Sequence, residues 1–103
     1  EQQYILVKVG HNHQKVLLKD ILYISAMREY VQYHSEQARL MELKSISSVE
    51  SILPHSHFLR IHRSFIIQKA AVIRHQGNKL FLKNGISLSI GKTYKKKVLK
   101  QLF

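Results

Sequence analysis

The architecture of this chain depends on one segment, Phe58-Leu59-Arg60-Ile61-His62-Arg63-Ser64-Phe65-Ile66-Ile67. Alternate side chains of an extended strand share one side, so Arg60 would join Phe58 while Arg63 would join Ile61. Neither side would then be cleanly apolar or cleanly polar. We therefore predict strand character over residues 58–67 with a break near His62, where His62, Arg63 and Ser64 project together from a loop or bulge.

Such a break would offer a cation, a guanidinium fork and a hydroxyl to one partner. An Arg side chain can bond guanine O6 and N7 together in the major groove of DNA, and His or Ser can bond phosphate oxygens. The segment is equally compatible with an exposed edge strand that carries incidental basic residues. Taken alone, it leaves both interpretations open.

Strand patterns extend outward from this segment in both directions. Toward the N-terminus, β-branched or alternating apolar residues predict strands at Tyr4–Val9 and at residues 15–18, 21–26, 30–34 and 39–44. Toward the C-terminus, similar patterns predict strands at residues 71–75, 80–82 and 86–90, with turns at 76–78 and at Asn84-Gly85. Asn-Gly is a strong hairpin signal, because both residues tolerate a positive φ.

Two short helices complete the predicted elements. Ser47-Ser48-Val49-Glu50 has capping-box spacing, in which the Ser47 hydroxyl accepts from a first-turn amide while Glu50 reaches back, and Pro54 stops the helix. Residues 93–103 place apolar side chains at helical spacing between lysines, which predicts a C-terminal amphipathic helix. We predict one mostly β domain that spans residues 1–103.

Net charge is the strongest compositional signal. The chain carries 17 Lys and Arg against 6 Asp and Glu, which gives +11. All six acids lie within residues 1–50, so residues 51–103 contain eleven basic residues and no acid. A half-domain with one sign of charge favours a polyanionic partner, because its charges otherwise repel one another. Nucleic acid fits better than an anionic membrane, which would require a longer basic amphipathic helix.

Composition and motifs also exclude several classes of protein. The absence of Cys removes disulfides, thiolate metal sites and Cys nucleophiles, and it fits a reducing cytosol. The apolar runs are far shorter than the roughly 18 residues of a membrane span, so we expect a cytoplasmic protein with no membrane contact. The sequence has no Gly-rich phosphate loop, and residues 51–103 have no acid that could orient His62 as a base. We expect that the chain is not an enzyme.

Two other binding chemistries rank lower. His11-x-His13 and His55-x-His57 each have a chelating spacing, but zinc requires three or four ligands, so we expect no metal and no cofactor. The stronger alternative is an OB-like module that binds single-stranded nucleic acid or RNA. Its stacking platforms would be Tyr23, Tyr30, Tyr33 and Phe81, although aromatic residues at strand spacing more often belong to the core.

Nearly the whole chain resembles one known family. The matching blocks are Asp20-Ile21-Leu22-Tyr23-Ile24-Ser25-Ala26, Glu29-Tyr30-Val31, Leu43-Lys44-Ser45-Ile46, the segment quoted first, and Leu88-Ser89-Ile90-Gly91-Lys92-Thr93-Tyr94. In these blocks and their spacing, the chain resembles the LytTR family of DNA-binding domains. The resemblance implies an elongated fold of three antiparallel sheets with about ten short strands, one short internal helix and a C-terminal amphipathic helix.

The resemblance also implies a function and partners. LytTR domains are commonly attached to a receiver domain in bacterial two-component response regulators, and their loops enter successive major grooves of promoter DNA. We therefore expect sequence-specific binding to double-stranded promoter DNA in transcription regulation. We also expect a receiver domain outside this chain and two copies on directly repeated sites.

Position by position, the resemblance implies that three loops touch DNA. The first supplies Arg28 and Glu29 and leads into Tyr30, the second supplies His62, Arg63 and Ser64, and the third supplies Gly91, Lys92 and Thr93. Arg63 stands at the base-reading position, and Arg60 and Lys69 are further expected contacts. The third loop departs from the Ser-Arg usual in the family. Because Lys92 lacks the planar fork of Arg, phosphate contact is favoured there over base reading.

Overall fold

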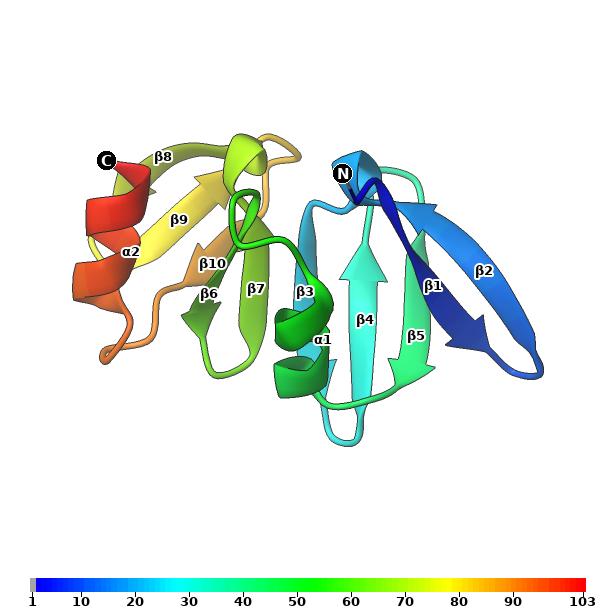
Figure 1. Ribbon diagram of the computed structural model, residues 1–103. Coiled ribbons are helices and arrows are strands. Elements are labelled where there is room, and N and C mark those ends of the chain that lie inside the picture. The colour runs from blue at the N-terminus through cyan, green and yellow to red at the C-terminus, as the bar shows by residue number, and fades with distance from the viewer. Residues whose placement is uncertain (1) are drawn as a thin grey trace.

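Ten strands and two α-helices form the fold in a computed structural model, which describes residues 2–103 (Figure 1). The strands are β1 (Tyr4–Val9), β2 (Asn12–Leu17), β3 (Tyr23–Met27), β4 (Tyr30–His34), β5 (Arg39–Leu43), β6 (Phe58–His62), β7 (Phe65–Gln68), β8 (Val72–Gln76), β9 (Lys79–Leu82) and β10 (Ser87–Ser89). The helices are α1 (Ile46–Ile52) and α2 (Lys95–Leu102), and two 3₁₀ turns, η1 (Leu18–Asp20) and η2 (Lys69–Ala71), connect strands.

The strands pair antiparallel in three sheets across the described residues. A five-stranded sheet with the order β5-β4-β3-β7-β6 lies between the β1-β2 hairpin and the three-stranded sheet β10-β9-β8 (Figure 1). The molecule measures 41 × 25 × 25 Å. The mostly β class, the three sheets and the elongated shape implied by the family resemblance are confirmed.

Two hydrophobic clusters pack against opposite faces of the central sheet, because successive strand residues point to opposite sides. Ile24 and Ile66 belong to the cluster that includes the β1-β2 hairpin and α1, whereas their neighbours Tyr23 and Ile67 belong to the cluster of the C-terminal sheet and α2. All four side chains are buried. One face of the central sheet is therefore covered by the β1-β2 hairpin and α1, and the other by the C-terminal sheet and α2. The turns that connect its strands remain at its edges.

The predicted break near His62 is confirmed as a β-hairpin. β6 and β7 pair antiparallel around the turn at residues 63–64, and their register shifts between Arg60 and His62. A bulge of this kind changes which side a residue faces. It allows Leu59 and Ile61 to be buried while Arg63 is exposed in the turn.

α1 begins two residues earlier than the capping-box spacing predicted, so the assignment of Ser47 as its cap is wrong. The cap is Ser45, whose hydroxyl accepts from the Ser48 amide at 3.1 Å. This start buries Ile46 and Val49 against the core. Glu50 does not reach back to the cap and instead pairs with Arg60.

Several predicted strand ends are misplaced, and two of them fall in 3₁₀ turns. Leu18 was expected to end the second strand but lies in η1, and Ala71 was expected to begin a strand but lies in η2. Both side chains are buried. A tight 3₁₀ turn redirects the chain toward another sheet while it keeps the apolar residue in the core, and alternation alone does not reveal this.

Glu42 fastens the β1-β2 hairpin to the central sheet. Its side chain is buried, and its carboxylate accepts from the Tyr33 hydroxyl at 2.7 Å and from the Lys8 backbone amide at 2.9 Å. Burial raises the pKa of Tyr33 above its usual value, and the hydrogen bond to Glu42 raises it further, so the phenol remains a donor. The two bonds offset the cost of removing this carboxylate from water.

His34 is buried on the other face of the sheet, as a neutral ring. It stacks on Tyr23 with 4.0 Å between ring centroids, and its Nε2 lies 2.8 Å from the Ser25 hydroxyl. Burial, helped by the charge of the Arg39 guanidinium, lowers the pKa of His34 to about 4. The unfolded chain takes up this proton near pH 6.5, so the stability that neutral His34 contributes is present above that pH and is lost as the pH falls toward 4.

We expect this linkage to lower the free energy of unfolding by about 2 kcal/mol between pH 7 and pH 5. Urea unfolding of the wild type and of His34→Gln at both pH values measures the effect, because Gln keeps a hydrogen-bonding group but does not titrate. His11→Gln, at an exposed turn position, is the matched control and should retain the wild-type pH dependence. A His34→Gln protein with the full wild-type pH dependence would contradict this assignment.

Candidate nucleic-acid interface

Three loops follow one another along one long edge of the molecule, the lower edge in Figure 1. They are the β3-β4 turn (residues 28–29), the β6-β7 turn (63–64) and the loop from β10 to α2 (residues 91–93). Backbone hydrogen bonds tie the second and third loops to strands of the central sheet, from the Ala26 amide of β3 to the Ser64 carbonyl at 2.9 Å and from the Gly91 amide to the Ile61 carbonyl of β6 at 2.7 Å. The structure thus gathers most of the residues expected from the sequence: Arg28, Glu29, Tyr30, His62, Arg63, Ser64, Gly91, Lys92 and Thr93.

His62 shapes the central turn from within. Its Nδ1 accepts from the Ser64 amide at 3.0 Å, and its ring packs on Phe65 with 5.1 Å between centroids. A ring whose Nδ1 accepts carries its hydrogen on Nε2. The half-buried His62 therefore holds the turn with one nitrogen and leaves Nε2–H as a donor for an anionic oxygen.

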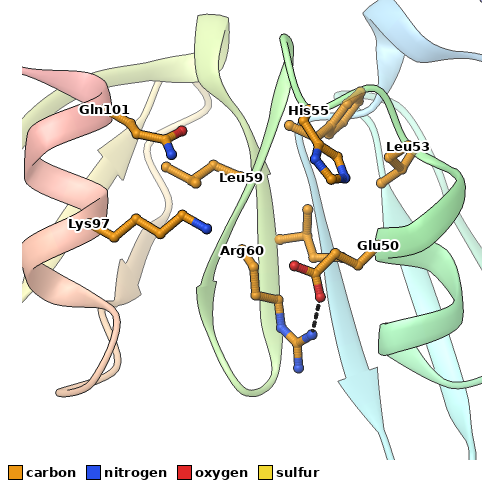
Figure 2. A pocket seen from close by; sticks show the side chains of 9 residues that line it. Glu50, Leu53, His55, Leu59, Arg60, Lys97 and Gln101 are labelled. Atoms are coloured by element: carbon orange, nitrogen blue, oxygen red, sulfur yellow. Dashed lines mark hydrogen bonds and ion pairs between the residues drawn. The ribbon is translucent and has the colours of Figure 1, made fainter.

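Arg60 lies beneath the same turn and is engaged within the protein. Its Nε donates to the His62 carbonyl at 2.7 Å, its Nη2 donates to the Arg63 carbonyl, and its Nη1 pairs with Glu50 Oε1 at 2.7 Å (Figure 2). Only 12% of the Arg60 side chain is exposed. Although the sequence favoured Arg60 as a DNA contact, its guanidinium faces the hairpin's own backbone.

Arg28 opens the first turn with a backbone φ of 57°, the one positive φ of a non-Gly residue in the described range 2–103. An L-residue in this region costs on the order of 1 kcal/mol, and such strain is concentrated at functional sites. The register fixes the turn, because Met27 pairs with Tyr30 on either side of Arg28-Glu29. The Arg28 side chain is consequently held at the exposed tip of the hairpin.

Gly91 lets the third loop approach the central hairpin closely. A Cβ at this position would lie 2.8 Å from Cδ2 of the Tyr94 ring and 3.3 Å from the His62 Cα. Both separations are shorter than ordinary van der Waals contact, so the loop could not stay where it is. This packing fixes the position of the exposed residues Lys92 and Thr93.

Gly91→Ala should therefore displace the third loop and lower the free energy of unfolding by about 1–2 kcal/mol. Urea unfolding measures the loss. Combining the change with Tyr94→Leu, which removes the ring, should reduce the penalty of Gly91→Ala. An equal penalty in both backgrounds would show that the Tyr94 ring does not set the position of this loop.

Lys69 is the one expected contact that the fold separates from the others. It lies in η2, at the far end of β7 from the 63–64 turn, near the upper edge of Figure 1. In the sequence, Lys69 follows Ser64 by only five positions. An extended strand of four residues spans roughly 13 Å, enough to carry Lys69 away from the loops.

Lys44 is a basic residue beside the first turn that the sequence did not single out. The Tyr30-Leu43 register and a 3.1 Å bond from the Lys44 amide to the Glu29 carbonyl place it next to Arg28-Glu29. Lys44 lies in one of the blocks that resemble the LytTR family, but nothing in that block marks it as a contact. Its position beside the first turn follows from the pairing of β4 with β5.

The charges on these three loops are suited to an anionic partner. Arg28, Arg63 and Lys92 are exposed, and within residues 2–103 their side chains have no hydrogen bond or ion pair. The acids nearby are mostly occupied, since Glu42 is buried between two donors and Glu50 pairs with Arg60. Unpaired cations on fixed loops favour binding of phosphate groups.

A metal site and a small-molecule site beside the Glu50-Arg60 pair find little support in the part of the chain described. Residues 2–103 contain no group of three or more His, Cys, Asp or Glu side chains that could hold a metal ion. A groove between α1 and α2 has a volume of about 80 Å³ and is lined by the Glu50-Arg60 pair, His55 and Lys97 (Figure 2). Organic ligands usually occupy roughly 300 Å³ or more. None of the described helices combines the length and apolar character needed to cross a membrane.

Comparisons with known proteins agree with this geometry. The family model of the LytTr DNA-binding domain matches residues 12–103. The Sensory transduction protein LytT of Bacillus subtilis (strain 168) is 26% identical over 106 residues, which covers 98% of this chain and 44% of LytT. A solved LytTr DNA-binding domain from Bacillus cereus aligns with a TM-score of 0.84 at 20% identity, covering 99% of this chain and 98% of that one, which shows a shared fold.

The fold and the three cationic loops define a β-type nucleic-acid-binding domain. More narrowly, the chain belongs to the LytTr DNA-binding domain family, because the family model matches most of its length. The resemblance noted in the sequence is thereby confirmed. The chain spans less than half the length of LytT.

Proposed function

We propose that residues 1–103 form one domain that binds double-stranded promoter DNA sequence-specifically, as the output domain of a cytoplasmic two-component response regulator. Its receiver domain would lie outside this chain. The three loops enter successive major grooves, where Arg63 reads a base edge. His62, Ser64, Arg28 and Lys92 bond phosphate oxygens or neighbouring base edges, with Glu29, Tyr30, Gly91 and Thr93 completing the contact surface.

The observation that carries this proposal is the arrangement of free cations on loops that follow one another along the molecule (Figure 1). Successive major grooves on one face of B-DNA are roughly 34 Å apart. The long dimension of the molecule, 41 Å, exceeds this spacing. Backbone hydrogen bonds from the second and third loops to β3 and β6 restrict the loops before DNA arrives, which reduces the entropy lost on binding.

Selection of bound duplexes from a random pool, followed by anisotropy titration, tests the proposal. The chain should bind the selected duplex at least 10³-fold more tightly than a scrambled duplex of equal length. Affinity should fall with salt by about 0.9 log units per log unit for each phosphate contact. Tighter binding to either single strand than to the duplex would overturn the proposal in favour of the OB-like alternative.

We further propose that two copies occupy directly repeated sites. Sedimentation of the chain with a one-site and with a two-site duplex should give one and two bound copies. A single copy on the two-site duplex at saturating protein would contradict this part of the proposal.

A further inference from the structure

We propose that Arg60 and Glu50 are positioning residues for Arg63: they set sequence selectivity by holding the β6-β7 turn, without touching DNA themselves. The inference rests on the proposed function, since it assumes that Arg63 reads a base. It assigns Arg60 a different role from that of a direct contact. It also gives α1, which supplies none of the proposed DNA contacts, a part in recognition.

Hydrogen bonds hold both of the peptide groups that flank the Arg63 Cα. Arg60 donates to the carbonyls of both His62 and Arg63. The Ser64 amide donates to His62 Nδ1, and the Ser64 carbonyl accepts from the Ala26 amide of β3. The peptide groups on both sides of the Arg63 Cα are therefore fixed, and the direction in which its side chain leaves the backbone is fixed with them.

Arg60 is suited to this task because its guanidinium is planar and carries donors in several directions. Two of its nitrogens face the turn and the third faces Glu50 Oε1 at 2.7 Å. The side chain is 12% exposed, and its position beneath the turn keeps it away from the surface that Arg63 presents. A Lys at this position would supply a point charge and could not span both carbonyls in one plane.

Glu50 determines which way the Arg60 fork points. The ion pair joins α1 to β6 across the groove between the helices, as Figure 2 shows, and Lys97 of α2 lies on the opposite side of that groove. Without Glu50, the freed end of the guanidinium could rotate toward solvent. The carbonyls of the turn would still be able to accept hydrogen bonds, but the turn would no longer be held in one conformation. A side chain that reads a base needs its backbone to be held in one conformation before binding.

The test is a double-mutant cycle measured by anisotropy titration on the selected duplex and on a scrambled duplex of equal length. Arg60→Met keeps the apolar stem but removes every donor. It should weaken binding to the selected duplex about 10-fold and binding to the scrambled duplex less than about 2-fold. In an Arg63→Ala background, Arg60→Met should cause almost no further loss. Glu50→Gln, which keeps an acceptor, should show the same pattern at a smaller size.

Two results would overturn the inference. Equal weakening on both duplexes would make Arg60 a phosphate contact or a general structural residue, and losses that add fully to those of Arg63→Ala would show that it does not act through Arg63. If circular dichroism shows that Arg60→Met is unfolded, the same cycle with Glu50→Gln decides. A wild-type chain that does not distinguish the two duplexes would instead refute the proposed function itself, a failure that is visible before any variant is made.

Discussion

Arg63→Ala is expected to weaken binding to the selected duplex by roughly 10- to 100-fold, about 1–3 kcal/mol, and to remove discrimination at one base pair. The Arg63 side chain is exposed and makes no hydrogen bond or ion pair within residues 2–103. Its removal should leave folding stability unchanged, so the loss reports an intermolecular contact. Anisotropy titration with duplexes changed at each position in turn locates the base pair.

Two matched variants sharpen this prediction. Arg63→Lys keeps the charge but not the planar fork, so it should lose most of the discrimination while it retains affinity for a scrambled duplex. Lys69→Ala, at the opposite end of β7, should behave like the wild type on every duplex and leave the salt dependence unaltered. If Arg63→Ala weakened the selected and scrambled duplexes alike, Arg63 would be a phosphate contact and another residue would read the base.

Glu42→Ala is expected to lower the free energy of unfolding by about 3 kcal/mol, since it removes two charge-assisted hydrogen bonds and leaves the Tyr33 hydroxyl buried without an acceptor. Tyr33 is 2% exposed, so water cannot easily replace the carboxylate. The Lys8 amide loses its acceptor at the same time, which loosens the β1-β2 hairpin from the central sheet. Urea unfolding at pH 7 measures the change.

The double variant Tyr33→Phe with Glu42→Leu is the informative companion to Glu42→Ala. Because it removes the donor together with the acceptor, it should be markedly more stable than Glu42→Ala. Glu36→Ala, at an exposed acid in the β4-β5 turn, controls for the loss of a negative charge from a strongly basic chain. A Glu42→Ala protein as stable as Glu36→Ala would show that the buried carboxylate does not hold the hairpin.

The sequence was sufficient for most of the architecture, because most strands alternate apolar and polar residues and several turns carry strong local signals. The mixed faces of residues 58–67 correctly indicated a break at His62, since no single strand could bury Leu59 and Ile61 while exposing Arg63. The family resemblance supplied the number of sheets and the elongated shape. Local patterns do not specify how separate sheets pack together.

Long-range pairing explains what the sequence did not reveal. Arg60 is a residue type that often contacts DNA, but here its guanidinium forms an ion pair with Glu50, ten residues earlier in the chain. This pairing depends on where α1 packs, which the sequence does not show. Ser45 and Ser47 both have capping potential, and only the burial of Ile46 and Val49 selects Ser45. The same reason applies to two lysines. Strand direction carries Lys69 away from the three loops, and strand register brings Lys44 beside the first of them.

The most direct measurement is an NMR titration of the ¹⁵N-labelled chain with the selected duplex at moderate salt. Amide shifts should concentrate in the three loops, at residues 28–30, 62–64 and 91–93. The amides of η2 and of the β9-β10 turn, along the opposite long edge of the molecule, should remain unperturbed. Shifts that concentrate at η2 and the β9-β10 turn, or spectra that do not change even at low ionic strength, would contradict the placement of DNA against these loops.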